Sequence, residues 1–228
     1  MERKVIIVCE GKSDLSYLHA LQRFVENDIA LPAGRNDPLL RFVPYPEPCG
    51  TCTGGYDKIT AAYRSAVEDF SPDPVEIWVD ADIYIRDEPL GPDSDRSNGE
   101  EYGNKSPDIP VFSFSFHNFE DFIVLHADDA VFLKWKELVL AARGAQSQRK
   151  HCDWPLPRAE YAPLFQKVLP HYSKRRTPFP LSVERLTNLR RHLNDPDVRS
   201  MASLLQTGIV FGEHLLQLFD AAYPGLIP

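Results

Sequence analysis

Three acidic residues follow apolar segments of the chain. They are Glu10, Asp80 and Asp82. Glu10 follows VIIVC and precedes Gly11, and the two aspartates belong to VDAD. Carboxylate oxygens are hard ligands that suit Mg²⁺ or Mn²⁺, and magnesium usually takes one or two carboxylates together with waters and phosphate oxygens of a substrate. The residue types therefore predict a divalent-metal site that can act on a phosphate group.

The segments before these acids read as buried strands. Residues 4–9 (KVIIVC) and 75–79 (VEIWV) are almost continuously apolar, as strands covered on both faces of a parallel sheet are. Between them, a helix with apolar residues at 15, 18, 21 and 25 follows a start that Ser13 or Asp14 can cap. A further strand over 40–45 and a helix over 56–70 complete a β-α-β-α-β alternation, which predicts an α/β fold with a parallel sheet.

The carboxyl ends of parallel strands meet at one rim of a sheet, where ligands bind. We therefore expect Glu10, Asp80 and Asp82 to lie close together. The side chains of Asp80 and Asp82 should also point the same way, because residues two apart on an extended segment lie on the same face. The alternative for each acid by itself is a solvated residue at the end of a strand.

The remaining chain divides into segments of different character. Residues 83–108 are polar and predict a long surface loop, 111–116 (VFSFSF) predict another strand, and a helix begins near Phe119. Only helical patterns follow. We therefore expect a metal-binding catalytic α/β domain over 1–127 and a helical basic appendage over 128–228.

Charge supports this division. Residues 1–133 hold 11 Lys and Arg against 25 Asp and Glu, whereas residues 134–200 hold 14 against 6, within a net charge of -8. A basic segment beside metal-binding carboxylates suits a polyanionic ligand. The alternative is a chance arrangement of charges on solvated helices.

Composition excludes other classes of protein. No apolar run approaches the roughly 20 residues that span a bilayer. The apolar stretch at the N-terminus is too short for a signal peptide, so we expect a cytoplasmic protein with four reduced cysteines.

Taken together, VIIVCEGKSDLSYL and IWVDAD resemble the Toprim domain of topoisomerases, primases and OLD-family nucleases, over residues 3–126. That family has a Rossmann-like sheet, with Glu-Gly after its first strand and Asp-x-Asp after its third. The resemblance implies that Glu10, Asp80 and Asp82 bind a catalytic Mg²⁺ or Mn²⁺.

Two further segments are most similar to small RloB-type Toprim proteins. FSFHNFEDFIVLH resembles their Phe-Glu-x-Trp-x-x-Leu-His helix, with Phe119, Glu120 and His126 in matching positions and Phe122 in place of the usual Trp. HYSKRR is similar to their Tyr-x-Lys segment, which gives Tyr172 and Lys174.

The chain is also similar to the Toprim subunits of PARIS-type phage-defence systems. These resemblances imply a nuclease in bacterial anti-phage defence, often beside an ATPase. The chain has no Walker-type glycine loop, so the ATPase would be a separate subunit.

Two residues outside the three acids have candidate roles in metal-assisted phosphodiester hydrolysis. Glu120 could complete a second metal position or act as general base, or it is an acid favoured by the helix dipole in the first turn. Lys174 could neutralise charge on the phosphate, or it is a solvated member of a basic run. Asp14 is expected to be a helix-start acid rather than a ligand.

Basic residues that could grip nucleic-acid phosphates are Lys174, Arg175, Arg176, Arg190 and Arg191. The alternative is an appendage that merely solvates its arginines. A rival function is a non-catalytic nucleic-acid-binding or regulatory subunit of an ATPase-containing defence complex. The spacing of Cys49 and Cys52 permits zinc, but a Gly-rich turn with two thiols explains it as well. The sequence gives no indication of an oligomeric state.

Overall fold

The computed structural model describes residues 3–31, 34, 37–46, 56–80, 113–115, 119–146, 163, 165–170, 172, 179–202 and 209–228. The segment 83–108, expected to form a long loop, lies outside them.

The described strands form one parallel five-stranded sheet in the order β2-β1-β3-β4-β5. The strand bounds are β1 Arg3–Cys9, β2 Leu40–Tyr45, β3 Val75–Val79, β4 Ser113–Phe114 and β5 Ile209–Val210. The expected α/β fold with a parallel sheet is confirmed, and its arrangement is Rossmann-like.

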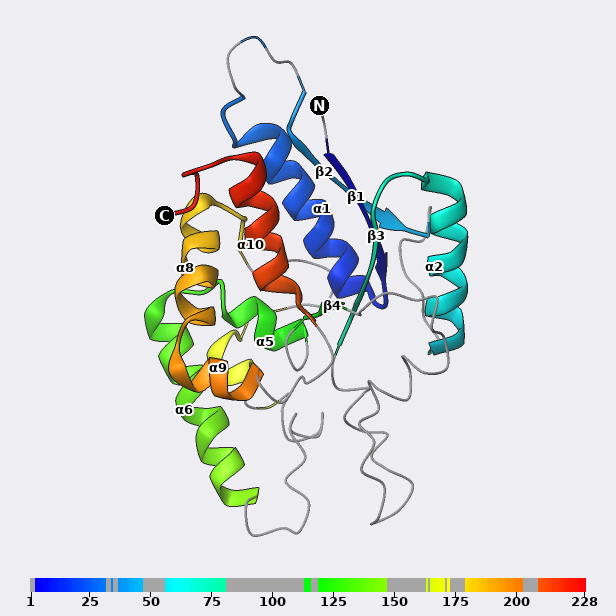
Figure 1. Cartoon of the computed structure of the whole chain (residues 1–228). Coiled ribbons are helices and arrows are strands. Elements are labelled where there is room, and N and C mark those ends of the chain that lie inside the picture. Colours follow the sequence, from blue (N-terminus) through cyan, green and yellow to red (C-terminus); the bar gives the residue numbers. More distant parts are fainter. Residues whose placement is uncertain are drawn as a thin grey trace.

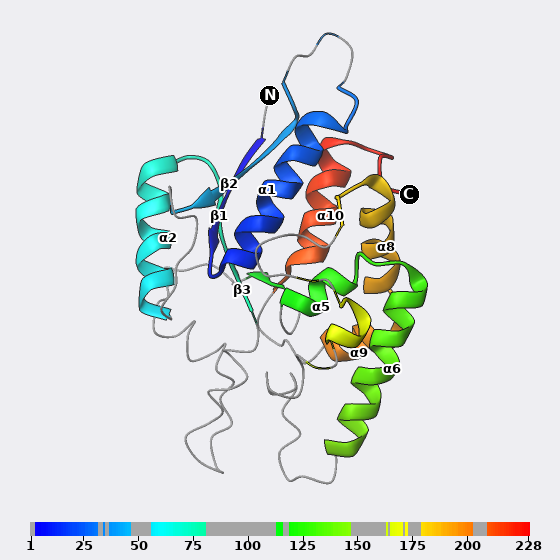
Figure 2. The same ribbon diagram turned by 180° about the vertical axis from the view of Figure 1, so that it is seen from behind.

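Helices surround the sheet. Their bounds are α1 Lys12–Asn27, α2 Tyr56–Phe70, α5 Phe119–Val124, α6 Asp129–Gln146, α8 Val183–Leu193, α9 Pro196–Ala202 and α10 Phe211–Ala222. Figures 1 and 2 show α2 on one side of the sheet and α1 and α10 on the other. None of these described helices has the length and apolar character to cross a membrane.

Burial on both faces explains the continuous apolar run of β1. Val5, Ile7 and Cys9 pack into the cluster on the side of α1 and α10, whereas Ile6 and Val8 pack into the cluster on the side of α2. All five side chains are fully buried. A strand between two helical layers has no face for polar residues, so its first charged residue after the run, Glu10, comes where the strand ends.

The beginning of α1 differs in detail from the sequence expectation. The N-cap residue is Gly11, and its backbone N–H donates to Asp14 Oδ2 over 2.8 Å. Neither Ser13 nor Asp14 is the cap itself, because both already lie in the first helical turn. Asp14 is nevertheless the helix-start acid that we expected, since it satisfies an N–H that the helix leaves without a partner.

The strand β5 is a correction to the expectation of helices alone after residue 128. It has two residues and pairs with Ser113 and Phe114 of β4. A segment of that length shows no apolar alternation, so periodicity could not reveal it.

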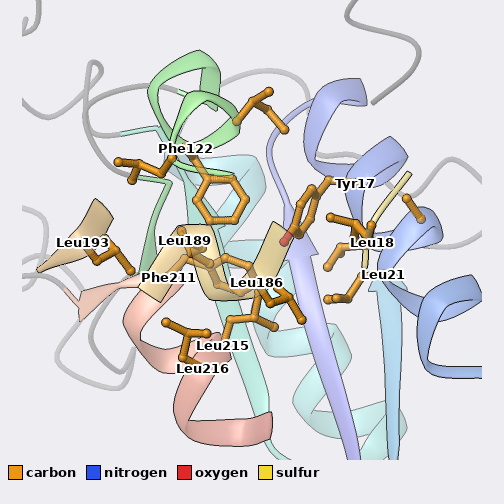
Figure 3. Packing of buried hydrophobic residues seen from close by; sticks show 14 of the residues in the cluster. Tyr17, Leu18, Leu21, Phe122, Leu186, Leu189, Leu193, Phe211, Leu215 and Leu216 are labelled. Atoms are coloured by element: carbon orange, nitrogen blue, oxygen red, sulfur yellow. The ribbon is translucent and has the colours of Figure 1, made fainter. Parts of the chain in front are cut away.

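One hydrophobic cluster crosses the expected boundary after residue 127. Figure 3 shows side chains of α1, α5, α8 and α10 packed together. Trp78 of β3 and Phe211 of α10 stack with ring centroids 3.9 Å apart. The division into 1–127 and 128–228 stays a prediction, but described parts of both segments share this core.

Candidate metal centre at the carboxyl rim of the sheet

Glu10 and Asp80 lie next to each other at the carboxyl ends of β1 and β3. These strands are neighbours, with Cys9 opposite Trp78, so the residues that follow them reach the same rim. The Glu10 carboxylate accepts a hydrogen bond from the backbone N–H of Asp80, with 3.2 Å between Oε2 and N. Both residues are partly buried. The structure thus brings together two of the three acids proposed as ligands.

Ser115 brings a third strand end to this rim. Its Oγ lies 2.6 Å from Asp80 Oδ1, and its backbone N–H donates to the carbonyl oxygen of Val79 over 3.0 Å. The side chain is fully buried. The sequence did not single out Ser115, because it is uncharged and lies within the strand expected over 111–116, whereas β4 ends at Phe114.

Glu120 stands in the first turn of α5, where the helix dipole favours an acid. In Figure 1, α5 lies near the end of the sheet at which α1 begins. The charge of Glu120 acts on Tyr172. Burial is the main cause that raises the pKa of Tyr172 well above its ordinary value, and the negative charges of Glu120, Asp14 and Asp80 add to it. The Tyr172 hydroxyl therefore stays protonated among acids from α1, α5 and the end of β3.

Tyr172 comes from the chain beyond residue 128 and packs against the hydrophobic cluster on the side of α1 and α10. Its ring packs edge-on against Phe165, with centroids 4.8 Å apart. The sequence suggested Tyr172 through the Tyr-x-Lys resemblance.

The donor set at the rim suits a divalent cation of the Mg²⁺ type. Glu10 and Asp80 offer carboxylate oxygens, and magnesium needs only one or two carboxylates besides waters and substrate oxygens. Within the part of the chain that the structure describes, no group of three or more His, Cys, Asp or Glu side chains gathers. The third proposed ligand, Asp82, lies outside that part.

Several other predicted residues also fall outside the described residues. They are Lys174, Arg175 and Arg176 of the basic run, and Cys49 and Cys52 of the zinc hypothesis.

Arg190 and Arg191, the other predicted phosphate contacts, lie on α8 in ion pairs. Arg190 binds Asp220 of α10, and Arg191 binds Asp129 of α6. Arg191 also donates to Asn188. These guanidinium groups pair with carboxylates of neighbouring helices, which leaves less of their charge for a polyanion.

His126, which the resemblance places at the end of the Phe-Glu motif, is a core residue. It is fully buried, and burial lowers the pKa of His126 to about 3. Its Nδ1 donates to the carbonyl oxygen of Phe122 over 2.9 Å, so the deprotonated Nε2 accepts from the Tyr17 hydroxyl, also over 2.9 Å. The neutral imidazole thereby ties α5 to α1, and with it the position of Glu120.

Comparisons of the chain with protein-family models, with curated proteins and with solved structures found no match.

Proposed function

We propose that this chain is a Toprim-like nuclease that uses Mg²⁺ or Mn²⁺ to hydrolyse phosphodiester bonds in DNA or in an RNA such as tRNA. The observation that supports the proposal is the hydrogen bond from the Asp80 backbone N–H to the Glu10 carboxylate, because these acids follow two neighbouring parallel strands at the rim where such sheets bind ligands. The sequence motifs that contain these acids, EGKSD and VDAD, resemble those of Toprim domains and support the same function.

In this proposal, Glu10, Asp80 and Asp82 hold the cation. When bound, the cation supplies charge stabilisation at the scissile phosphate and lowers the pKa of an attacking water. Glu120 accepts the proton of that water or completes a second metal position, and Lys174 neutralises charge on the phosphate.

The biological setting is part of the same proposal. The Toprim resemblance favours a cytoplasmic effector of bacterial anti-phage defence that works beside a separate ATPase subunit. Basic residues of the segment 134–200, including Lys174, Arg175 and Arg176, would hold the backbone of the nucleic acid.

A cleavage assay tests the proposal. Plasmid, single-stranded DNA and total tRNA are incubated with the protein in Mg²⁺ or Mn²⁺, and Glu10→Gln and Asp80→Asn are compared with the wild type. Each substitution removes the charge of a ligand at nearly constant shape, so we expect cleavage to fall by about 100-fold or more. Glu68→Gln, on the exposed face of α2, is the matched control and should cut normally.

Two outcomes would contradict the proposal. Cleavage that survives both substitutions removes Glu10 and Asp80 from the reaction. A wild-type protein that cuts no substrate, even with its native ATPase partner, favours the non-catalytic nucleic-acid-binding or regulatory subunit.

A further inference from the structure

The Ser115 hydroxyl lies between the ends of β4 and β3, within reach of two acceptors. Its Oγ is 2.6 Å from Asp80 Oδ1 and 3.3 Å from the carbonyl oxygen of Val79. A hydroxyl carries one proton, and the shorter contact to a carboxylate has the length of a charge-assisted O–H···O⁻ bond. The Ser115 hydroxyl therefore donates to Asp80.

The sheet fixes the position of this donor. The backbone N–H of Ser115 donates to the Val79 carbonyl oxygen over 3.0 Å, which continues the pairing of β4 with β3 beyond Phe114. The Ser115 side chain is fully buried and has a single rotatable bond to its oxygen. A donor on such a short side chain, anchored to the neighbouring strand, loses little freedom when it binds Asp80.

Asp80 is also held through its backbone. Its N–H donates to Glu10 Oε2 over 3.2 Å, while its carboxylate receives the Ser115 hydroxyl. The ends of β1, β3 and β4 are thus joined through one residue. These two hydrogen bonds help to orient Asp80 relative to Glu10 before any cation is present.

We propose that Ser115 is a positioning residue of the metal centre, whose hydroxyl holds the Asp80 carboxylate in the orientation that binds a divalent cation. The inference rests on the proposed function, because it assumes that Asp80 is a ligand. Hydrogen-bond donors to the ligands of a metal orient those ligands, and their removal typically weakens metal affinity about 10–100-fold.

A series of substitutions at residue 115 separates a hydrogen-bonding role from a packing role. Ser115→Ala removes the hydroxyl, Ser115→Cys nearly keeps the shape but donates poorly, and Ser115→Thr keeps the hydroxyl and adds a methyl group. Ser113→Ala is the matched control, since Ser113 is a buried serine of β4 two residues before Ser115, so that the two side chains lie on the same face of the sheet.

The measurement is Mn²⁺ affinity, from the electron paramagnetic resonance signal of free Mn²⁺ during titration of the full chain. Melting in EDTA checks that each variant is folded. We expect the Kd to rise about 10–100-fold in Ser115→Ala and Ser115→Cys, whereas Ser115→Thr and Ser113→Ala keep a Kd near that of the wild type.

The outcomes distinguish the inference from the proposed function. Wild-type protein that binds no Mn²⁺ overturns both. Wild-type binding that Asp80→Asn abolishes, together with an unchanged Kd in a folded Ser115→Cys variant, overturns the role of Ser115 alone. A weaker Kd in Ser115→Thr than in Ser115→Cys would assign Ser115 to packing. If Ser115→Ala or Ser115→Thr does not fold, the Mn²⁺ Kd of the wild type compared with that of Ser115→Cys tests the role of the hydroxyl.

Discussion

His126 is a buried histidine whose protonation state is coupled to folding. Its two ring nitrogens connect the Tyr17 hydroxyl of α1 with the Phe122 carbonyl group of α5, and this network needs Nε2 without a proton. Burial lowers the pKa of His126 from 6.5 to about 3. In the unfolded chain the imidazole takes up a proton near pH 6.5, whereas in the folded chain it resists protonation down to about pH 3.

Stability should therefore fall as the pH falls below 6.5, because unfolding then binds a proton at His126. Between pH 7 and pH 5 we expect this residue to cost about 2 kcal/mol of unfolding free energy. Urea unfolding at the two pH values measures the loss in the wild type and in His126→Gln, which cannot protonate. The variant should lose less on acidification than the wild type does.

His19→Gln is the control, because His19 is exposed on α1 and should leave the pH dependence as in the wild type. An equal loss of stability in the wild type and in His126→Gln would contradict a neutral, buried His126.

Among single residues, the candidate ligands could be predicted where a charged residue follows a strand. Glu10 and Asp80 are such residues, and the structure places them in contact. Ser115 occupies the same kind of position but has no charge, so it did not stand out until its hydrogen bond to Asp80 was seen. Tyr172 packs against the hydrophobic core through tertiary contacts, which no local sequence pattern reveals.

The arginines of α8 form ion pairs within the protein. Arg185, Arg190 and Arg191 pair with Asp128, Asp220 and Asp129, which come from other parts of the chain. The density of positive charge along 134–200 is real, but on α8 it is partly neutralised within the protein. A count of charges along the sequence cannot distinguish paired arginines from available ones.

Arg190 and Arg191 should therefore contribute less to nucleic-acid binding than Lys174, Arg175 and Arg176. Each phosphate contact with single-stranded DNA adds about 0.7 to the slope of log affinity against log salt. We expect Arg175→Gln with Arg176→Gln to reduce that slope more than Arg190→Gln with Arg191→Gln does, although both variants remove two charges, as measured by fluorescence anisotropy with single-stranded DNA. A larger reduction in the α8 variant would contradict the structural role of its arginines.

The strands and helices around the site were predictable from apolar spacing. The strand over 40–45, the helix over 56–70 and the strand over 75–79 have the expected bounds. Of the strand expected over 111–116, the structure describes residues 113–115 and places Ser113–Phe114 in β4. Periodicity failed at β5, since two residues contain no period, and its place in the sheet depends on pairing with β4.

At the scale of the whole molecule, one core joins the beginning and the end of the chain. Val5 of β1, Tyr17 of α1, Phe211 and Phe219 of α10 belong to the same buried cluster. The stack of Trp78 on Phe211 connects the central strand β3 directly with the C-terminal helix. The described parts of 128–228 that enter this core should not unfold separately from the sheet.

Phe211→Ala tests this coupling. Removal of a fully buried aromatic ring typically costs about 3–5 kcal/mol. We expect a single urea transition, followed by tryptophan fluorescence and by far-UV circular dichroism, to move as a whole to lower urea. Leu133→Ala, at a side chain that is 55% exposed, is the control and should change little. Two separate transitions, of which only one responds to Phe211→Ala, would show that the segments fold independently.

Our central proposal is that Glu10 and Asp80 bind a divalent cation at the carboxyl rim of the sheet. Anomalous scattering from a crystal of the protein soaked in Mn²⁺ tests it most directly. We expect an anomalous peak in direct contact with carboxylate oxygens of Glu10 and Asp80, and we expect it to be absent in Asp80→Asn crystals. A peak elsewhere, or none at the rim at saturating Mn²⁺, would contradict it.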